Sequence, residues 1–155
     1  MKNLIEVEVK NVVLLQSEEG MAIAVVLKEK SGSRLLPIII GPFEAKAISM
    51  ALNGETFSRP LTHDLMHEIL SVLGVKVDKV IINDLVDGTY YARIILSHDG
   101  KTYSIDSRPS DAIALALRAG APIFVSSSVM DTASEYFPDF EGDEPEWEGG
   151  GDLGG

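Results

Sequence analysis

The chain repeats one order of sequence patterns, and this repeat restricts its fold more than any other feature. In each half, three strand-like stretches precede a helix that begins with proline, carries an acidic residue two positions later and ends near a glycine. The two helix starts are Pro42 with Glu44 and Pro109 with Asp111. Proline suits the first helical position, and an anion is favoured in the first turn. The repeat predicts an internal duplication, with halves at about residues 1–74 and 75–137.

The strand-like stretches either alternate polar and apolar residues or are apolar throughout, and turn residues separate them. The six predicted strands lie at about residues 5–10, 21–28, 34–40, 75–82, 89–96 and 102–106. Asp87-Gly88 and Asp99-Gly100 are typical of tight turns between paired strands. Consecutive strands with short turns form antiparallel meanders. We therefore predict an α+β fold in which a duplicated unit of three strands and one or two helices builds a mostly antiparallel sheet packed with helices.

A second helix is predicted in the first half, over about residues 62–73, with Thr62 as its N-cap. Its apolar residues fall on one face, and they are Leu65, Met66, Ile69, Leu70 and Leu73. His63 and His67 lie on the opposite face. A weaker helix over residues 126–137 would complete the second half.

The charge of the chain is unevenly distributed. The 155 residues carry a formal charge of −11, yet seven of the 24 acidic residues lie in 138–155, a Gly-rich segment without Lys or Arg. Residues 1–137 therefore carry about −4. The composition predicts one domain over 1–137 and a disordered acidic tail over 138–155. A charge of −11 disfavours nucleic acid as a partner, but most of it belongs to the tail.

Several classes of protein are excluded by composition. The chain has no cysteine, which rules out thiol catalysis, disulfides and Cys-ligated metals. No apolar run approaches the roughly 18 residues of a membrane span, so we expect no membrane partner. Charged residues come too early at the N-terminus for a signal peptide. We therefore expect a cytoplasmic protein.

Two histidines four residues apart, His63 and His67, form the first candidate site. With Asp64 between them they resemble the His-Glu-x-x-His pattern of zinc proteases. Asp is one methylene shorter than the glutamate base of those enzymes, and no third ligand is evident. His67 is therefore better explained as a surface residue.

Two arginine–proline pairs, Arg59-Pro60 and Arg108-Pro109, form the second candidate site. Each arginine stands before a helix start, where free backbone N–H groups favour an anion, and a guanidinium there can hold a phosphate. The alternative is an ion pair that fixes the helix start. The carboxylates of Glu44, Asp64 and Asp111 lie near the same strand-to-helix junctions. If they converge, their hard oxygens suit Mg²⁺ or Mn²⁺.

Three motifs occur in order along the chain: Leu36-Pro37-Ile38-Ile39-Ile40-Gly41 with Glu44-Ala45, then Arg59-Pro60-Leu61-Thr62-His63-Asp64-Leu65, then Arg108-Pro109-Ser110-Asp111-Ala112. Over roughly residues 3–135 the chain thereby resembles the bifunctional nuclease domain family. The resemblance implies an α+β domain, a homodimer and the activity toward RNA and DNA that is ascribed to plant members. The positions that match the family motif are Glu44, Arg59, His63, Asp64, Arg108 and Asp111. His67 lies outside it.

The resulting hypothesis is a metal-dependent nuclease, a phosphodiesterase acting on RNA, DNA or both. Mg²⁺ or Mn²⁺ held by Glu44, Asp64 and Asp111 would activate water. His63, with Asp64, would be catalytic, and Arg59 and Arg108 would bind phosphate. Two alternatives remain open: a non-enzymatic dimeric binding or regulatory module, in which the same residues form caps and ion pairs, and a module that binds a small phosphate-containing ligand.

Overall fold

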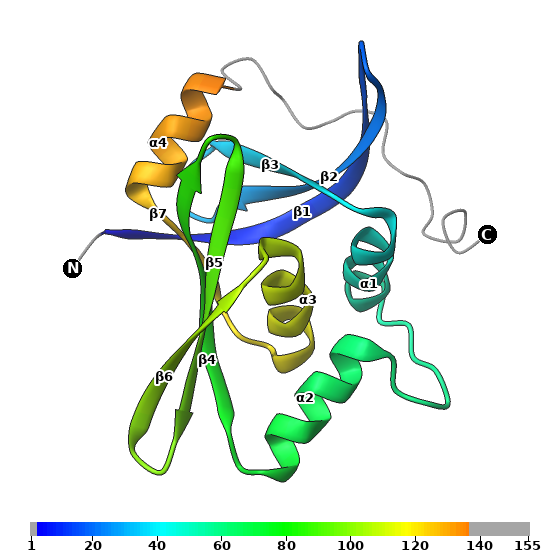
Figure 1. Ribbon diagram of the computed structural model, residues 1–155, viewed down its shortest axis with the longest axis vertical. Helices are drawn as coiled ribbons and strands as arrows, with labels where there is room; N and C mark the ends of the chain where they lie inside the picture. The colour runs from blue at the N-terminus through cyan, green and yellow to red at the C-terminus, as the bar shows by residue number, and fades with distance from the viewer. Residues whose placement is uncertain (1–2, 137–155) are drawn as a thin grey trace.

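The computed structural model describes residues 3–136 and contains one mixed sheet with four helices. The acidic segment 138–155 lies outside the described residues. The first half contains β1 (Leu4–Ser17), β2 (Gly20–Glu29), β3 (Leu35–Ile40), α1 (Pro42–Leu52) and α2 (Thr62–Val72). The second half contains β4 (Lys76–Val86), β5 (Thr89–His98), β6 (Lys101–Ser107), α3 (Pro109–Ala119), β7 (Ile123–Ser126) and α4 (Ser127–Tyr136). The α+β prediction is confirmed, and Figure 1 shows how these elements are arranged.

The seven strands are ordered β3-β2-β1-β7-β4-β5-β6. Each half contributes an antiparallel meander of three strands, and β7 joins the two meanders by pairing antiparallel with β1 and parallel with β4. Both halves therefore open with three strands and a helix, as the repeat predicts, but the second half adds β7. Because element order alone does not show common descent, the internal duplication stays a prediction.

Local sequence chemistry accounts for both turns of the second meander. Asp87 and Asp99 have φ angles of 51° and 50°, and the glycine after each also has a positive φ. Two successive residues with positive φ form the type I′ turn, whose twist matches that of the paired strands. The Asp-Gly pairs thus fix where β4 meets β5 and where β5 meets β6.

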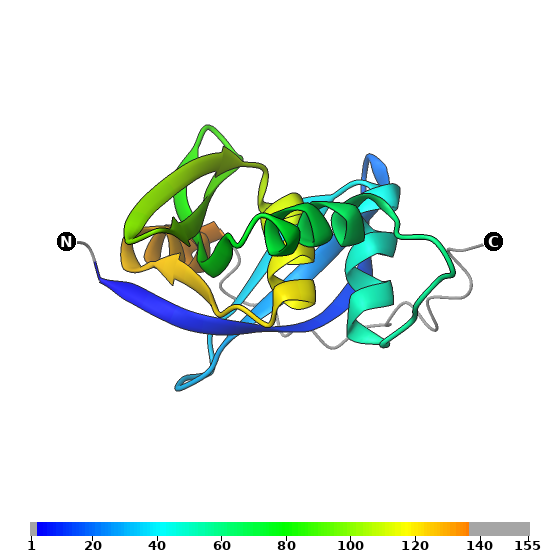
Figure 2. The ribbon, with the colours of Figure 1, turned by 90° about the horizontal axis from the view of Figure 1, so that it is seen from below.

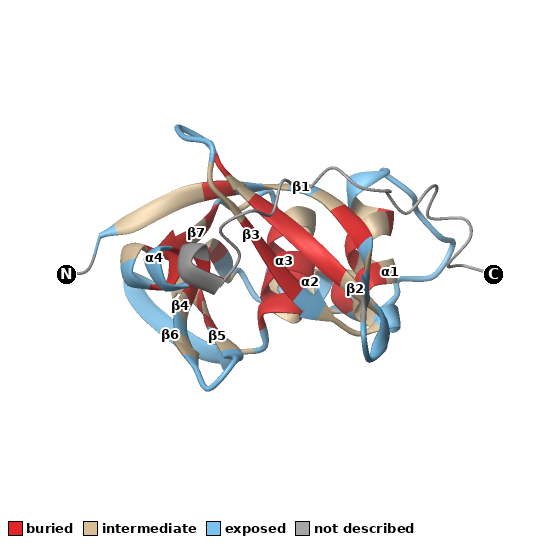
Figure 3. Ribbon diagram, turned by 90° about the horizontal axis from the view of Figure 1, so that it is seen from above, coloured by how far each residue is buried: buried red, intermediate tan, exposed pale blue. Residues whose placement is uncertain are grey.

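Helix α3 is the centre of the molecule. It packs against α1, α2, β4 and β5, and its buried positions are mostly small: Pro109, Ser110, Ala112, Ile113, Ala114, Leu115 and Ala116. Small side chains let neighbouring elements approach closely. Figure 3 colours much of α3 as buried, between the strands and the other helices. Figure 2 shows α1 and α2 next to α3. The first turns of three helices are thereby brought to one region.

Helix α2 is placed differently from a simple amphipathic helix. Its buried residue is His63, which is only 9% exposed, whereas Leu65 and Ile69 on the predicted apolar face are 48% and 49% exposed. Met66 and Leu70 pack partly against the core. The N-cap is Leu61 and not Thr62, because the chain is still extended at Leu61 and helical from Thr62. None of the helices within residues 3–136 is long and apolar enough to cross a membrane.

Candidate active site

A cavity of about 630 Å³ lies where α1, α2 and α3 meet. Its polar lining residues come from all three helices and from the residue before α3: Glu44, Lys46, Thr62, His63, Arg108, Asp111 and Arg118. Four of the residues singled out in the sequence, Glu44, His63, Arg108 and Asp111, therefore line one cavity. They come together because α3 contacts both α1 and α2.

These four side chains form one continuous chain of hydrogen bonds and ion pairs. His63 Nε2 lies 2.9 Å from Asp111 Oδ1. Arg108 Nε donates to Asp111 Oδ2 at 2.9 Å, and Arg108 Nη2 donates to Glu44 Oε2 at 3.3 Å. The order is His63, Asp111, Arg108, Glu44. The carboxylate holds one ring nitrogen of His63, Nε2. The other ring nitrogen, Nδ1, can then exchange a proton with a substrate or with water.

The Asp111 carboxylate is held in its ionised form. Burial by itself would raise its pKa, but the hydrogen bonds from Arg108 and His63 and the charges of both outweigh burial, so the pKa lies below the ordinary value of an aspartate. Asp111 is therefore an anion throughout the neutral range. An anion at Nε2 fixes the orientation of the His63 ring.

Glu44 reaches Arg108 because of the glycine before α1. A Cβ at Gly41 would collide with Glu44 Oε1, so the absence of a side chain lets the carboxylate fold back over the start of the helix. Gly41 itself is extended, with φ of −81°. It is the missing Cβ, and not an unusual backbone angle, that this position requires.

Asp64 belongs to a second set of contacts. One carboxylate oxygen accepts a hydrogen bond from the Leu61 N–H at 3.0 Å, and the other accepts one from Arg118 Nε at 2.7 Å. Burial would raise the pKa of Asp64, but the Leu61 N–H and Arg118 lower it further than burial raises it. Both oxygens of Asp64 are thus used to hold the start of α2.

Arg118 is the functional residue that the sequence analysis missed. Besides Asp64, it donates to Ala114 O at 2.9 Å and to Ala47 O at 3.1 Å, so it ties α1, α2 and α3 together. One signal pointed to it: Arg118 follows Asp111 by seven residues and so shares its face of the helix.

Arg59 does not join this network. It lies exposed in the loop between α1 and α2, and no hydrogen bond or ion pair links it to another residue of the described chain. Only the Arg59 side chain stands apart, because Pro60 lines the same cavity as Arg108. The second histidine of α2, His67, also lies outside the cavity that His63 lines.

The donors predicted for a metal ion lie in two separate sets of contacts. Among residues 3–136, no group of three or more His, Cys, Asp or Glu side chains is placed to share one metal ion. Glu44 and Asp111 do meet, but Arg108 Nη2 binds both, at 3.3 and 2.9 Å. Asp64 is paired with Arg118 instead. As arranged, an arginine binds one oxygen of each of the three carboxylates, and the three do not surround one position that Mg²⁺ or Mn²⁺ could take.

Comparison with known proteins adds independent information. Residues 25–137 match the sequence model of the Bifunctional nuclease domain. An uncharacterised protein of Mycobacterium tuberculosis is 44% identical over 118 residues, which cover 76% of this chain and 70% of that protein. Bifunctional nuclease 1 of Oryza sativa is 36% identical over 110 residues, covering 68% of this chain and 33% of the rice protein. Bifunctional nuclease 1 of Arabidopsis thaliana is 34% identical over 107 residues, or 66% and 33% of the two chains. The chain thus spans about a third of these plant relatives.

Proposed function

The chain belongs to the bifunctional nuclease domain family, and on that premise we propose that it hydrolyses phosphodiester bonds of RNA, DNA or both in the cavity between α1, α2 and α3. The printed names of the plant relatives support a nuclease. We place the reaction in this cavity because His63 Nε2 is hydrogen-bonded to Asp111 there. A histidine oriented by a carboxylate is an arrangement that supports general acid–base catalysis.

In the proposed reaction His63 acts as the general base. Its Nδ1 takes a proton from water, or from the ribose 2′-hydroxyl of RNA, while that oxygen forms a bond to phosphorus. The P–O bond to the leaving oxygen breaks, and the leaving oxygen takes up a proton from solvent. Asp111 holds Nε2 of His63 and stabilises the imidazolium that forms. The ring is preorganised because His63 is buried in the wall of the cavity.

Arg108 is the residue we propose to bind the phosphate. Its side chain is 64% exposed although it is fixed by Asp111 and Glu44, and its Nη1 makes no hydrogen bond with the described part of the chain. A guanidinium held in this way can bind a phosphate oxygen in a fixed direction. Arg59, which is exposed on the neighbouring loop, would meet a phosphate further along the strand. Metal dependence stays a prediction, and no step of this mechanism passes through a metal.

The test is cleavage of single-stranded RNA and DNA oligonucleotides by the full chain, with Mg²⁺, with Mn²⁺ and with EDTA. We expect His63→Ala to slow cleavage by about 10²- to 10⁴-fold, the usual contribution of a general base. His67→Ala is the matched control, because His67 lies one turn further along α2 and outside the cavity. Full activity in His63→Ala would show that the assignment of the base is wrong.

The same assay separates the two alternatives. A non-enzymatic binding module predicts no turnover with any oligonucleotide, whether metal or chelator is present. A module for a small phosphate-containing ligand predicts that a mononucleotide raises the unfolding temperature of the chain. Neither alternative predicts that loss of the His63–Asp111 hydrogen bond changes a cleavage rate, because neither includes cleavage.

We also propose that the chain acts as a homodimer through the exposed apolar face of α2. Large apolar side chains gather on this helix and on the neighbouring edge strand β6, and they are Leu65, Ile69, Val72, Leu73, Tyr103 and Ile105. Two of them, Ile69 and Ile105, line an apolar hollow of about 270 Å³ between the helices α2 and α3 and the strands β5 and β6. Exposed apolar patches of this kind are typical of association surfaces.

A further inference from the structure

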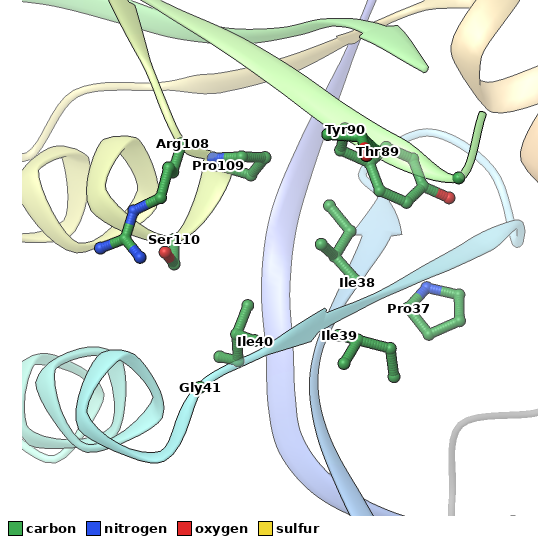
Figure 4. A pocket seen from close by; sticks show the side chains of 11 residues that line it. Pro37, Ile38, Ile39, Ile40, Gly41, Thr89, Tyr90, Arg108, Pro109 and Ser110 are labelled. Atoms are coloured by element: carbon green, nitrogen blue, oxygen red, sulfur yellow. The ribbon is translucent and has the colours of Figure 1, made fainter. Parts of the chain in front are cut away.

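A second cavity lies next to the proposed active site and has a different character. Its volume is about 430 Å³, and it is lined by the end of β3, the first residues of β5 and the start of α3. Arg108 lines both cavities, so they meet at its side chain. Figure 4 shows Arg108 and Ser110 on one side of this second cavity and Tyr90 on the other. Its volume lies in the range of small-ligand sites, about 300–1,000 Å³.

The wall of the second cavity is apolar and holds one aromatic ring. Ile38 and Pro109 are buried, and the half-buried ring of Tyr90 stands above Ile38 in Figure 4. Apolar side chains and an aromatic face are what a flat heterocycle stacks on. A phosphate alone would gain nothing from such a wall. The cavity is therefore suited to the base of a nucleotide and not to its backbone.

Arg108 and Ser110 bring polar groups to one end of the second cavity, and Thr89 and Tyr90 bring hydroxyls to the other. Ser110 is only 6% exposed, and no hydrogen bond joins its hydroxyl to another described residue. Its Oγ is not fully enclosed, so the hydroxyl can hydrogen-bond a ligand that enters the cavity. Ser110 also lies in the first turn of α3, whose free N–H groups attract an anion. This end of the cavity suits the sugar–phosphate of the nucleotide whose base lies near Tyr90.

We propose that this second cavity is a nucleobase subsite, which takes one unpaired base next to the phosphate on Arg108. The inference rests on the proposed nuclease function and specifies its substrate. A base can enter only if it is unstacked and unpaired, which costs a few kcal/mol in a duplex and little in a single strand. The substrate is therefore single-stranded nucleic acid, and base stacking replaces the basic surface that a body of charge −4 lacks.

The experiment measures binding apart from cleavage. The full chain with His63→Ala is titrated with a short single-stranded oligonucleotide, with the same strand carrying abasic sites, and with the duplex, in EDTA. We expect the abasic strand and the duplex to bind about 5- to 100-fold more weakly than the intact strand, as loss of one stacked base predicts. Equal affinity for the intact and abasic strands would overturn the subsite, and this comparison needs no further change to the protein.

A set of variants then tests whether the base stacks on the Tyr90 ring. Tyr90→Leu should weaken binding of the intact strand by about 5- to 100-fold and leave the abasic strand unaffected, whereas Tyr90→Phe keeps the ring and should keep the affinity. Tyr91→Leu is the matched control, because Tyr91 is the next residue of β5 and does not line the cavity. A folded Tyr90→Leu chain that binds the intact strand as tightly as its parent would overturn the assignment.

The outcome also separates this inference from the proposed function. If cleavage depends on His63 but is unchanged by abasic sites and by Tyr90→Leu, the nuclease function is supported and the nucleobase subsite is contradicted. Base-dependent binding without any cleavage would retain the subsite and remove the nuclease.

Discussion

Single residues in this protein are held mainly by arginines that bind more than one partner. The clearest case outside the active site is Glu29, at the end of β2. Its carboxylate accepts hydrogen bonds from the backbone N–H, Nε and Nη2 of Arg34 at 3.0, 3.1 and 2.9 Å. The hydrogen bond with the Arg34 side chain lowers the pKa of Glu29 and outweighs the effect of burial. Arg34 also binds Asp131 of α4. Arg34 therefore links the turn between β2 and β3 to α4 through two carboxylates.

Glu29→Gln should lower the free energy of unfolding by about 1.5–3 kcal/mol at pH 7, the usual cost of losing hydrogen bonds to a charged group. The Glu29 side chain is 11% exposed but the Arg34 side chain is 38% exposed, so solvent screens the pair in part and the lower end of this range is expected. A carboxylate with a lowered folded-state pKa stabilises the fold above its unfolded pKa of about 4.3 and loses that contribution as pH falls through the folded value.

Urea unfolding at pH 7 and at pH 3 checks this expectation. The difference between the parent chain and Glu29→Gln should shrink at the lower pH. A difference of the same size at both pH values would mean that the charge of Glu29 is not what stabilises the turn.

Among the elements, α2 depends most on polar contacts. Leu65, Ile69 and Val72 are exposed and only Met66 and Leu70 pack against the core. The contacts of His63 with Asp111 and of Asp64 with Arg118 therefore contribute much to the position of α2. Asp64 is therefore best understood as a positioning residue, which holds the helix turn that carries His63. This differs from the catalytic role that the sequence suggested for Asp64, and the two roles make different predictions.

Asp64→Asn should lower the free energy of unfolding by about 1–2 kcal/mol. Loss of one partner of a fully buried ion pair costs about 3–5 kcal/mol, and the value is smaller here because 38% of the Asp64 side chain is exposed. If Asp64 only positions His63, the cleavage rate should fall by less than in His63→Ala, and its pH profile should keep its shape. A rate loss as large as that of His63→Ala would restore the catalytic role. Cleavage rates measured as a function of pH, together with thermal unfolding of each variant, distinguish these outcomes.

The elements also show what could be predicted from sequence. Local chemistry was sufficient for the Asp-Gly hairpins and for the helices that begin at Pro42 and Pro109, because turn and cap preferences depend on neighbours in the chain. Strand β7 was missed because it has four residues and exists through pairing with β1 and β4, which are distant in sequence. Periodicity revealed the apolar face of α2 but not whether another element covers it.

The candidate site was predicted in part for the same reason. Glu44, His63, Arg108 and Asp111 were recognised because each stands at a strand-to-helix junction or helix start, and the packing of α3 brings them together. Arg118 was missed because its partners Asp64 and Ala47 lie 54 and 71 residues away in the sequence. Arg59 shares its motif with Arg108, but its side chain is exposed and makes no ion pair with the described residues.

At the scale of the whole molecule, the apolar face of α2 should control the oligomeric state. Ile69→Glu places a charge at the centre of this face, where burial against a second copy would cost several kcal/mol. We expect the parent chain to sediment as a dimer at micromolar concentration and the Ile69→Glu chain as a monomer. Val86→Glu, at the far end of β4, is the control, because Val86 is also exposed but lies outside this face. A monomeric parent chain would remove the homodimer from the proposal.

The overall charge is the other property of the whole molecule that bears on function. A chain ending at Phe137 carries about −4 instead of −11, so it should repel a polyanion less. We expect it to bind a single-stranded oligonucleotide more tightly than the full chain at 0.01 M salt, where charges act over about 30 Å, and equally at 1 M, where they act over about 3 Å. The matched control is a full-length chain in which the seven acidic residues of 138–155 are replaced by Asn or Gln, since it keeps the length and removes the charge. If charge causes the gain in affinity, this control should bind the oligonucleotide as tightly as the shortened chain does. Equal affinities of all three chains at low salt would show that the acidic segment does not screen the site.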